Sequence, residues 1–436
     1  MKPRNLPKIL FLLSLFLLFY IFYKSELHWG GSLRNYYKKY YILSFILIFL
    51  SIFTFYINNK IYLYLKIFLI TIFFSLYSFE FYLSFFSKGG RMEKQIHEYR
   101  KMTGYDYDTR SRYEVYNDLK EKNEKVVVKI SPKNFINNKN YPLPLSGVSN
   151  SETIYCNENG YYFIYQSDRY GFNNPDSEWD RKNIDYLLIG DSFVHGACVN
   201  RPNDMASVLR NLSSNAVLNL GYSSNGPLLQ LATLKEYLKP NIKNIIWIYF
   251  EGNDLNELGE ELNSILLKKY LNDINFLQNL KYKQNEVDKI VSSLLLKEKN
   301  IESLSTKFIK FIKLFNTREI IFSQTNIKTT KSANYIIEFS RILKQAKLLA
   351  KKNESKLFFV YLPDYYRFNT DYDNSSYIKI KKIINGLDIP FIDISDKISK
   401  DKDNYKQYYP FGMAGHFNEY GYKKIAEKIF NYTINN

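Results

Sequence analysis

"YLLIGDSFVHG" at residues 186–196 runs four apolar residues into Gly190, Asp191 and Ser192. An apolar run that ends in a glycine and two polar residues is typical of a buried strand followed by a tight turn and a helix. Asp and Ser are the residue types that cap helices, and a serine at such a turn is equally a candidate nucleophile. The stretch therefore predicts a strand–turn–helix unit and leaves the role of Ser192 to its surroundings.

Short apolar runs rich in Ile, Val and aromatic residues alternate with helical stretches through the second half of the chain. The runs span residues 184–190, 215–221, 245–252, 356–363 and 389–395. Buried strands that alternate with helices indicate a parallel sheet covered on both faces, and ligands bind such sheets beyond the carboxyl ends of the strands. We therefore predict a three-layer α/β domain over residues 181–436, with Ser192 at its ligand-binding edge.

Residues 256–350 separate the third and fourth of these runs and are mostly helical in composition. A single crossover between parallel strands needs far fewer residues. The segment is predicted to be a helical insertion, either packed on the core or covering the ligand-binding edge. Ahead of the domain, residues 90–180 are expected to form a connector and a β-rich segment, in which 152–175 is typical of a hairpin.

Three apolar runs near the N-terminus predict a membrane anchor over residues 1–89. They span residues 9–23, 40–57 and 61–86 and are 15, 18 and 26 residues long. No small-residue cleavage site follows Tyr23, so the first run is interpreted as an anchor and not as a secretory signal. We therefore predict three transmembrane helices. Lys66 and Glu80 lie inside the third run, either near an interface or as functional charges in the membrane.

The formal net charge of the chain is +17, with a calculated pI of about 9.3. The lysines are spread along the chain and no nucleic-acid-binding module is visible, so a membrane surface is the expected partner and nucleic acid is not. With the N-terminus inside, the loop charges disfavour an external domain, whereas the basic N-terminal tail is compatible with one. The charge pattern leaves the membrane orientation open.

The sequence has two cysteines, Cys156 and Cys198. The absence of a CxxC pair argues against a structural zinc site of the usual kind. The two cysteines could form one disulfide, which requires an oxidising compartment, or remain two buried thiols. A disulfide would tie the segment before the α/β domain to the helix that carries Ser192.

Four segments occur in a diagnostic order along the predicted sheet edge. They are "GDSF" at 190–193, "NLGYSSNGP" at 219–227, "EGND" at 251–254 and "GHFNEYGYKKIAEKI" at 415–429. This order resembles the SGNH hydrolase superfamily, also called the GDSL family of esterases, over roughly residues 180–433. The resemblance implies a flavodoxin-like sheet and a serine mechanism without cofactor or metal. It makes Ser192 the nucleophile, His416 the general base, and Asn253 an oxyanion donor.

The histidine content is consistent with this assignment. Of the four histidines, His28 and His97 flank the membrane runs, and His195 lies three residues after Ser192 on the same predicted helix. His195 is therefore expected to point away from the hydroxyl. His416 follows the last predicted strand and precedes an amphipathic helix, which is the approach that a base for Ser192 requires.

The chain departs from the family pattern at three positions. The glycine of the second segment, whose backbone N–H would bind the oxyanion, falls at Ser224, with Gly221 as the less favoured alternative. Glu251 stands where the third segment has glycine. Met413 stands where the family has the aspartate that orients the histidine. The expected replacement is either a backbone carbonyl near Met413 or the carboxylate of Asp364 or Asp393.

These observations predict a membrane-anchored serine esterase or O-acyltransferase, with its catalytic domain outside the cytoplasm. By resemblance, its substrate is an acylated glycan or lipid of the cell envelope. Water as acceptor would make it an esterase and a sugar hydroxyl a transferase, and the sequence does not choose between them. Two alternatives stay open: a non-catalytic envelope protein that binds a glycan or a partner, and a lipid esterase facing the cytoplasm.

Overall fold

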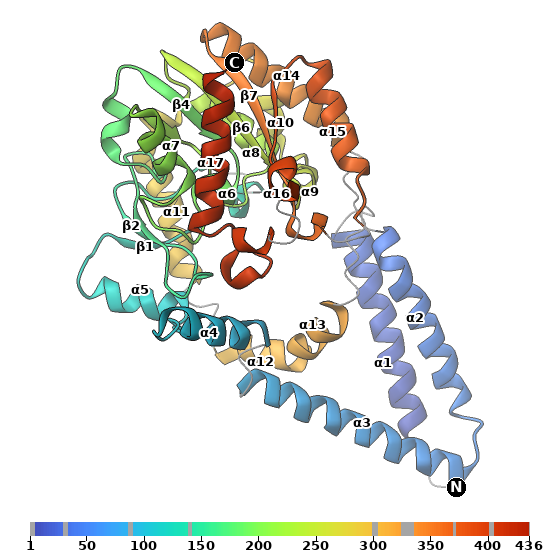
Figure 1. Cartoon of the computed structure of the whole chain (residues 1–436). Helices are drawn as coiled ribbons and strands as arrows, with labels where there is room; N and C mark the ends of the chain where they lie inside the picture. The colour runs from blue at the N-terminus through green and yellow to red at the C-terminus, as the bar shows by residue number, and fades with distance from the viewer. Residues whose placement is uncertain are drawn as a thin grey trace. The chain divides into compact units, whose positions relative to one another are not determined.

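The computed structural model describes residues 5–28, 34–85, 90–137, 142–298, 304–323, 335–368, 372–400 and 405–435. The chain divides into two compact units (Figure 1). One unit comprises residues 1–88 together with 308–325, and the other comprises residues 89–307 and 326–436. A segment of the predicted helical insertion therefore belongs with the N-terminal helices.

The larger unit contains a five-stranded, all-parallel sheet. Its strands lie in the order β5 (Val217–Asn219), β4 (Ile184–Ile189), β6 (Ile242–Phe250), β7 (Lys356–Leu362) and β8 (Phe391–Asp393). Each strand falls within or overlaps one of the apolar runs, so the predicted parallel α/β sheet is confirmed. The chain passes from β4 to β5 on one side and then to β6 on the other. This change of direction at β4 is the switch point where such sheets bind ligands.

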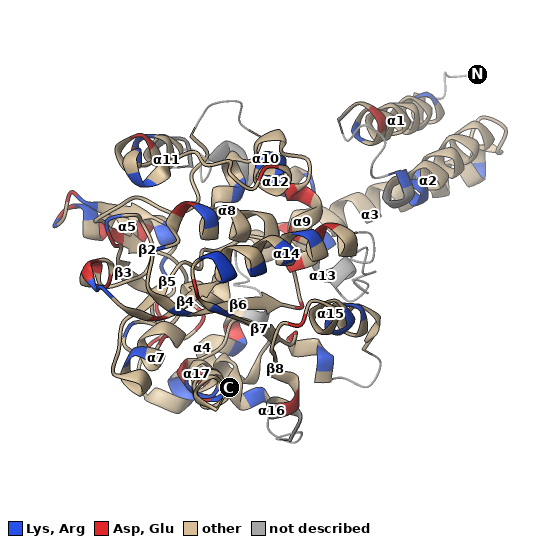
Figure 2. Cartoon of the chain, turned by 90° about the horizontal axis from the view of Figure 1, so that it is seen from above, with Lys and Arg blue, Asp and Glu red and all other residues tan. Residues whose placement is uncertain are grey.

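Two hydrophobic clusters occupy the two faces of this sheet. Alternate residues of β4 point into them, because successive side chains of a strand face opposite ways. Leu187 and Ile189 pack with α8 (Pro227–Tyr237) and α14 (Ile336–Lys352). Leu188 packs with α7 (Met205–Ser213) and α17 (Glu419–Ile434) on the other face. Figure 2 shows α8 and α14 on one side of the sheet and α7 and α17 on the other.

A smaller sheet precedes the large one in the chain. It consists of β1 (Val126–Val128), β2 (Glu152–Ile154) and β3 (Ile164–Gln166), with β1 parallel and β3 antiparallel to β2. The predicted hairpin is therefore present. Helix α5 (Arg112–Lys120) packs against this sheet and begins at a capping box. The segment between β2 and β3 carries Cys156.

The other helices of the larger unit are mostly short. They are α4 (Gly90–Thr103), α6 (Ser192–His195), α9 (Asp254–Glu261), α10 (Ile265–Asn272), α11 (Gln284–Glu298), α12 (Leu304–Ile312, which extends into the N-terminal unit), α15 (Ser375–Gly386) and α16 (Ser395–Lys400). Short 3-10 helices span Pro132–Phe135, Asp176–Asp180, Leu280–Tyr282, Tyr365–Phe368, Tyr405–Tyr408 and Pro410–Gly412. Within the insertion, residues of α9, α10, α11 and α14 join one core cluster, so these helices form a packed layer on the sheet.

The N-terminal unit contains α1 (Asn5–Phe22), which continues as a π-helix over Tyr23–His28, then α2 (Arg34–Phe53), α3 (Asn59–Phe85) and α13 (Phe315–Ser323). Among the described residues, two helices are long and apolar enough to cross a membrane: Asn5–Leu27 and Asn59–Ser84. The prediction of three such helices is wrong for the middle run. Helix α2 begins at Arg34 and ends at Phe53, and its apolar part after the basic first turns is about 14 residues, or ~21 Å, against ~30 Å of hydrocarbon.

Glu80, the acidic residue inside the third apolar run, contacts α13. Its Oε2 accepts the backbone N–H and the hydroxyl of Thr317, both at 2.8 Å, and its Oε1 accepts the backbone N–H of Asn316 at 3.1 Å. A carboxylate at a helix N-terminus satisfies N–H groups that have no partner within the helix. Glu80 therefore joins α13 of the insertion to α3.

Candidate active site

The turn after β4 places Ser192 at the carboxyl edge of the sheet. Gly190 has no room for a side chain, because a Cβ there would lie 2.4 Å from Val194 Cγ2. The Asp191 carboxylate accepts the backbone N–H of Phe193 at 2.9 Å and caps α6. The capping role in this motif thus falls to Asp191, which leaves the Ser192 hydroxyl for other contacts.

His416 lies on the loop before α17, and its Nε2 is 2.9 Å from Ser192 Oγ. Asn418 fixes this loop, because its Oδ1 accepts the N–H of Gly421 at 2.9 Å and its Nδ2 donates to the Tyr409 carbonyl at 3.2 Å. A serine hydroxyl becomes a good nucleophile when a base within hydrogen-bond reach takes its proton. The fold brings the two residues named from the sequence into that relation.

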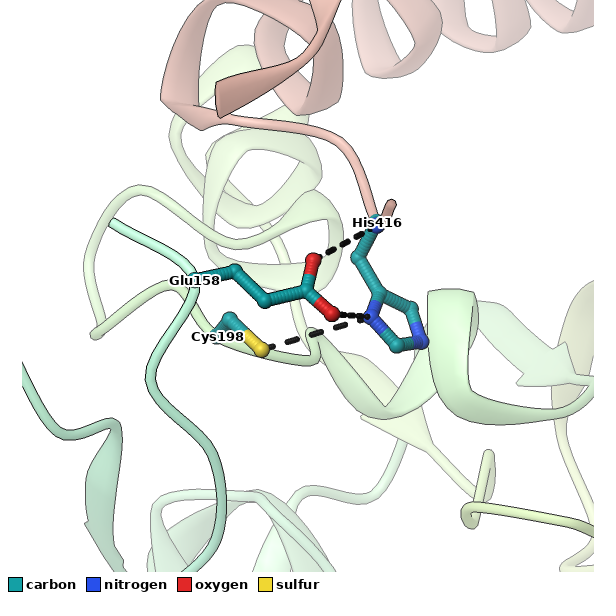
Figure 3. Close-up of side chains that lie close together, drawn as sticks. All are labelled: Glu158, Cys198 and His416. Carbon is teal, nitrogen blue, oxygen red and sulfur yellow. Dashed lines mark hydrogen bonds and ion pairs between the residues drawn. The ribbon is translucent and has the colours of Figure 1, made fainter. Parts of the chain in front are cut away.

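Glu158 holds the other side of the histidine. Its Oε1 lies 3.0 Å from His416 Nδ1, and its Oε2 accepts the backbone N–H of His416 at 2.8 Å (Figure 3). Because the carboxylate accepts a hydrogen bond from Nδ1–H, Nε2 carries no proton and can take the proton of Ser192. Burial lowers the pKa of His416, but the charge of Glu158 and its hydrogen bond outweigh burial and raise that pKa above its ordinary value.

The replacement for the missing aspartate was not found by sequence reasoning. Asp393 is engaged elsewhere, accepting the hydroxyl of Tyr377 at 2.5 Å and the N–H of Ser395 at 2.8 Å. Asp364 Oδ1 accepts the N–H of Tyr366 at 3.2 Å. Both proposed carboxylates, and a backbone carbonyl near position 413, are therefore wrong. Glu158 comes from the segment between β2 and β3, 258 residues before His416.

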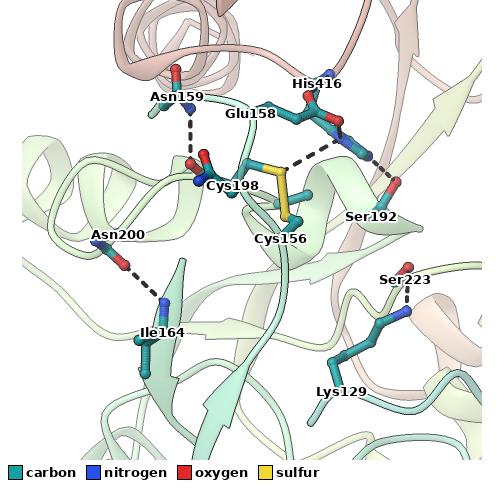
Figure 4. Close-up of a disulfide and its surroundings, with 12 residues drawn as sticks. Lys129, Cys156, Glu158, Asn159, Ile164, Ser192, Cys198, Asn200, Ser223 and His416 are labelled. Atoms are coloured by element: carbon teal, nitrogen blue, oxygen red, sulfur yellow. Dashed lines mark hydrogen bonds and ion pairs between the residues drawn. A yellow bond between two sulfur atoms is a disulfide. The ribbon is translucent and has the colours of Figure 1, made fainter. Parts of the chain in front are cut away.

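A disulfide between Cys156 and Cys198 positions the segment that carries Glu158. Cys156 lies two residues before Glu158, and Cys198 follows α6, the helix that begins with Ser192. Asn159, on the other side of Glu158, donates to the Cys198 carbonyl at 2.8 Å (Figure 4). The Glu158 segment is thus attached at both ends to the chain just after the serine. The cysteine pair was the one sequence signal that could have led to Glu158.

Glu158, Cys198 and His416 bring three atoms of metal-ligand type within 4.8 Å of one another. Their chemistry does not fit a metal centre, because the Cys198 sulfur is bonded to Cys156 and cannot act as a thiolate. The remaining pair is a carboxylate that holds an imidazole nitrogen, which matches the orienting role described above.

The segments after β5 and β6 flank Ser192, because β4 lies between these two strands. After β5, Ser224 has a left-handed backbone with a φ of +62°, and Ser223 is held by the Lys129 ammonium, which donates to its Oγ at 2.9 Å. The Gly221 N–H donates to Asn219 Oδ1 at 2.9 Å, so this amide is already engaged. Gly221 instead allows close packing, because a Cβ there would lie 2.4 Å from Val194 Cβ, and the oxyanion role of Ser224 stays a prediction.

After β6, Asn253 occupies the N-cap position of α9 without making a side-chain capping bond. Burial raises the pKa of Asp191, and its contacts with Phe193 and the Asn253 side chain partly oppose that effect. This contact places Asn253 beside the Ser192 turn, on the side of the sheet edge opposite Ser224.

Buried carboxyl groups surround this edge. Burial, together with nearby carboxylates, raises the pKa of Glu257 to about 8, and burial raises that of Glu261 to about 7. Glu251, which stands at a family glycine position, is buried in an ion pair with Arg367 at 2.5 Å. The Glu251 charge is therefore compensated by a partner outside the Ser192–His416 pair.

His195 lies in the core. Its ring stacks between those of Tyr155 and Tyr222, with centroids 5.1 and 4.5 Å away, and it is fully buried. Burial lowers its pKa well below the ordinary value, so it is neutral near pH 7. Its Nδ1 lies 3.4 Å from the Ser223 N–H. His195 thus supports the segment before Ser224.

No family model and no curated protein sequence matches the chain. Eighteen chains of solved structures match it. One is assigned to the G-D-S-L family of lipolytic proteins and comes from Desulfitobacterium hafniense DCB-2; it has 15% sequence identity and a TM-score of 0.31, over 57% of this chain and 98% of that one. Another is the YxiM protein of Bacillus subtilis, with 12% identity and a TM-score of 0.32, over 57% of this chain and 55% of that one.

The fold is identified by features of the chain itself. The strand order reverses at β4, and the four motif segments follow the expected strands. The serine of the first segment meets the histidine of the last at 2.9 Å. The larger unit of this chain therefore has a parallel α/β fold whose motif positions resemble those of the SGNH hydrolases, the GDSL family.

Proposed function

We propose that this protein is a membrane-anchored serine esterase or O-acyltransferase that acts on an acylated glycan or lipid of the cell envelope. The observation that carries the proposal is the line of contacts Ser192–His416–Glu158, with distances of 2.9 and 3.0 Å. A helix cap or a core histidine needs no such line, whereas an activated serine nucleophile does.

The first half-reaction transfers the acyl group to the serine. His416 Nε2 takes the proton of Ser192 as Oγ attacks the ester carbonyl carbon and forms a C–O bond. The backbone N–H groups of Ser192 and Ser224 and the amide of Asn253 stabilise the oxyanion. His416 then gives the proton to the leaving alkoxide as the ester bond breaks, which releases an alcohol and leaves an acyl-enzyme.

The second half-reaction repeats these steps with an acceptor hydroxyl. His416 takes the acceptor proton, the acceptor oxygen attacks the acyl carbonyl, and Ser192 recovers its proton as the acyl–Oγ bond breaks. Water yields an acid and a sugar hydroxyl yields a new ester. The Glu158 carboxylate stabilises the imidazolium that forms in each half.

The proposed location is the cell membrane, with the catalytic unit on the extracytoplasmic side. Two helices of spanning length support the anchor, and the disulfide of Cys156 supports an oxidising compartment. The same disulfide argues against a lipid esterase that faces the cytoplasm.

Activity-based labelling tests the proposal directly. The full chain in detergent is treated with a fluorophosphonate, and any adduct is mapped by mass spectrometry beside the Ser192→Ala, His416→Ala and Ser213→Ala variants. Ser213 provides the matched control, because its hydroxyl makes only local contacts, donating to the Leu209 carbonyl at 2.8 Å and accepting the Asn215 N–H at 3.3 Å. We expect labelling at Ser192 in the wild type and in Ser213→Ala, and no labelling in Ser192→Ala or His416→Ala. Absence of labelling in a folded protein that retains its disulfide would refute the catalytic proposal and favour a non-catalytic envelope protein.

A further inference from the structure

A cavity of about 380 Å³ adjoins the Glu158 side of the candidate active site. It lies over the small sheet, and its walls come from the segments around β1, β2 and α5 and from the first residues of α4. Cavities of this size hold a sugar or a small molecule. None of the residues given a role in acyl transfer lines it, so the reaction described above leaves it without a function.

Positive charge dominates the wall of this cavity. Arg110, Arg112 and Lys129 line it, against a single lining carboxylate, Asp108. Arg110 forms ion pairs with Asp108 and with Asp118, both at 2.6 Å, which fixes the position of its guanidinium. The Nε and Nη2 of Arg110 already donate to Asp108 and its Nη1 to Asp118, so Arg112 is the lining arginine suited to bind a carboxylate or phosphate through paired hydrogen bonds.

Three tyrosines form another part of the wall. Tyr107, Tyr155 and Tyr162 line the cavity. The hydroxyl of Tyr162 donates to the Arg110 carbonyl at 2.8 Å, and the Lys129 ammonium lies 4.7 Å from the centroid of the Tyr155 ring. Aromatic faces beside cations offer both apolar contact and charge, as a ring-shaped polar ligand requires. A simple acyl chain would instead be matched by an apolar wall.

The cavity is joined to the reacting groups at two places. Cys156 and Asn157 line it and lead directly into Glu158. Lys129 also lines it and donates to Ser223 Oγ at 2.9 Å, next to the Ser224 backbone. Figure 4 shows Lys129 and Ser223 near Cys156 and the Ser192–His416 pair. A ligand in the cavity would therefore lie beside both the acid and the segment that binds the oxyanion.

We propose that this cavity is a subsite for an anionic sugar, a uronate or a sugar phosphate, of the glycan that gives or receives the acyl group. This inference rests on the proposed function and specifies that the glycan substrate is anionic. Arg112, together with Lys129, binds the anionic group, and the tyrosines contact the sugar ring.

Binding to the full-length Ser192→Ala protein in detergent tests the subsite without catalysis. The probes are trigalacturonate, glucose 6-phosphate and, as a neutral sugar, maltotriose, measured by calorimetry. We expect one or both anionic probes to bind, with affinity that falls as salt rises, and maltotriose to bind at least tenfold more weakly. Trigalacturonate alone would identify a uronate, and glucose 6-phosphate alone a sugar phosphate.

Variants assign the binding to the cavity. Arg112→Gln should weaken the anionic probe about tenfold, and Arg112→Lys should restore part of the loss. Arg100→Gln removes the same charge from an exposed ion pair with Asp106, outside the cavity, and should bind as the parent does. The proposal would be overturned if maltotriose bound as tightly as the anionic probes, or if neither anionic probe bound. It would also be overturned if Arg112→Gln and Arg100→Gln lost the same amount of affinity. Fluorophosphonate labelling without anion binding would overturn the subsite alone, whereas anion binding without labelling would overturn the acyl-transfer function alone.

Discussion

Glu158→Gln is the substitution that most directly tests the arrangement around His416. The amide oxygen can still accept a hydrogen bond from Nδ1, but the substitution removes the negative charge that lies 3.0 Å from the ring and replaces the oxygen that accepts the His416 backbone N–H by an NH₂ group. At an effective dielectric constant of about 20, the charge pair is worth roughly 5 kcal/mol. About a quarter of each side chain is exposed, so solvent screening reduces this figure to about 3–4 kcal/mol.

This loss of imidazolium stabilisation corresponds to a fall of about 10²- to 10³-fold in the rate of serine acylation. The substitution should also shift the pH dependence of the labelling rate. The neutral form of His416 is the active base, and Glu158 helps to hold its pKa above the ordinary value. Removing the charge therefore lowers this pKa, and the rising limb of the pH–rate profile moves to lower pH even though the maximal rate falls.

The assay is the second-order rate of fluorophosphonate labelling from pH 5 to 9, for the wild type, Glu158→Gln and Glu158→Asp. Glu152→Gln provides a matched control on the neighbouring strand, where the carboxylate accepts from Asn123 at 2.9 Å. We expect partial rescue by Asp and wild-type behaviour in the control. A Glu158→Gln protein that is labelled at the wild-type rate with an unshifted limb would refute the role of Glu158.

Three further predictions concern other parts of the larger unit. Replacing Cys156 and Cys198 together by serine should cost about 4 kcal/mol of stability for a loop of 42 residues and slow the labelling of Ser192, as measured by denaturant unfolding and probe kinetics. In the folded chain the pKa of Glu257 is raised to about 8, so its contribution to stability is present below the unfolded pKa and is lost as the pH rises toward 8. The thermal unfolding midpoint of the wild type should therefore fall over that pH range. The fall should be smaller in Glu257→Gln, which cannot ionise. Met413→Asp should leave the labelling rate within about twofold, because Nδ1 of His416 already has its carboxylate; a tenfold gain would contradict this reasoning.

Much of the fold follows from the order of apolar runs in the sequence. Each strand of the large sheet consists mostly of buried residues, and the turn after β4 needs the small Gly190 because Val194 and the Ile248 carbonyl lie against it. The pairing of Ser192 with His416 followed from the motifs, because the carboxyl ends of parallel strands meet at one edge. Local pattern and sheet topology were sufficient for these features.

Glu158 lay beyond such reasoning for a physical reason. It is on a segment of the small sheet, and neither the spacing nor the residue type of that segment marks it as part of the site. Its position depends on a tertiary link through Cys156, and pairing of distant residues is not encoded in local periodicity. The prediction of a spanning helix in the middle apolar run was wrong for a different reason. Composition shows that the run is apolar, but the length of the apolar helix is decided by where α2 begins, at Arg34, and where it ends, at Phe53.

Two different parts of the larger unit hold the three contacting residues. Ser192 is fixed by the end of β4 and His416 by the start of α17, both within the sheet domain. Glu158 is held through the disulfide by a segment outside it, and that same segment forms a wall of the cationic cavity. The acid and the proposed subsite are therefore carried by the same segment. We expect that a substitution in the small sheet that weakens binding of the anionic probes also changes the rate at which the fluorophosphonate labels Ser192.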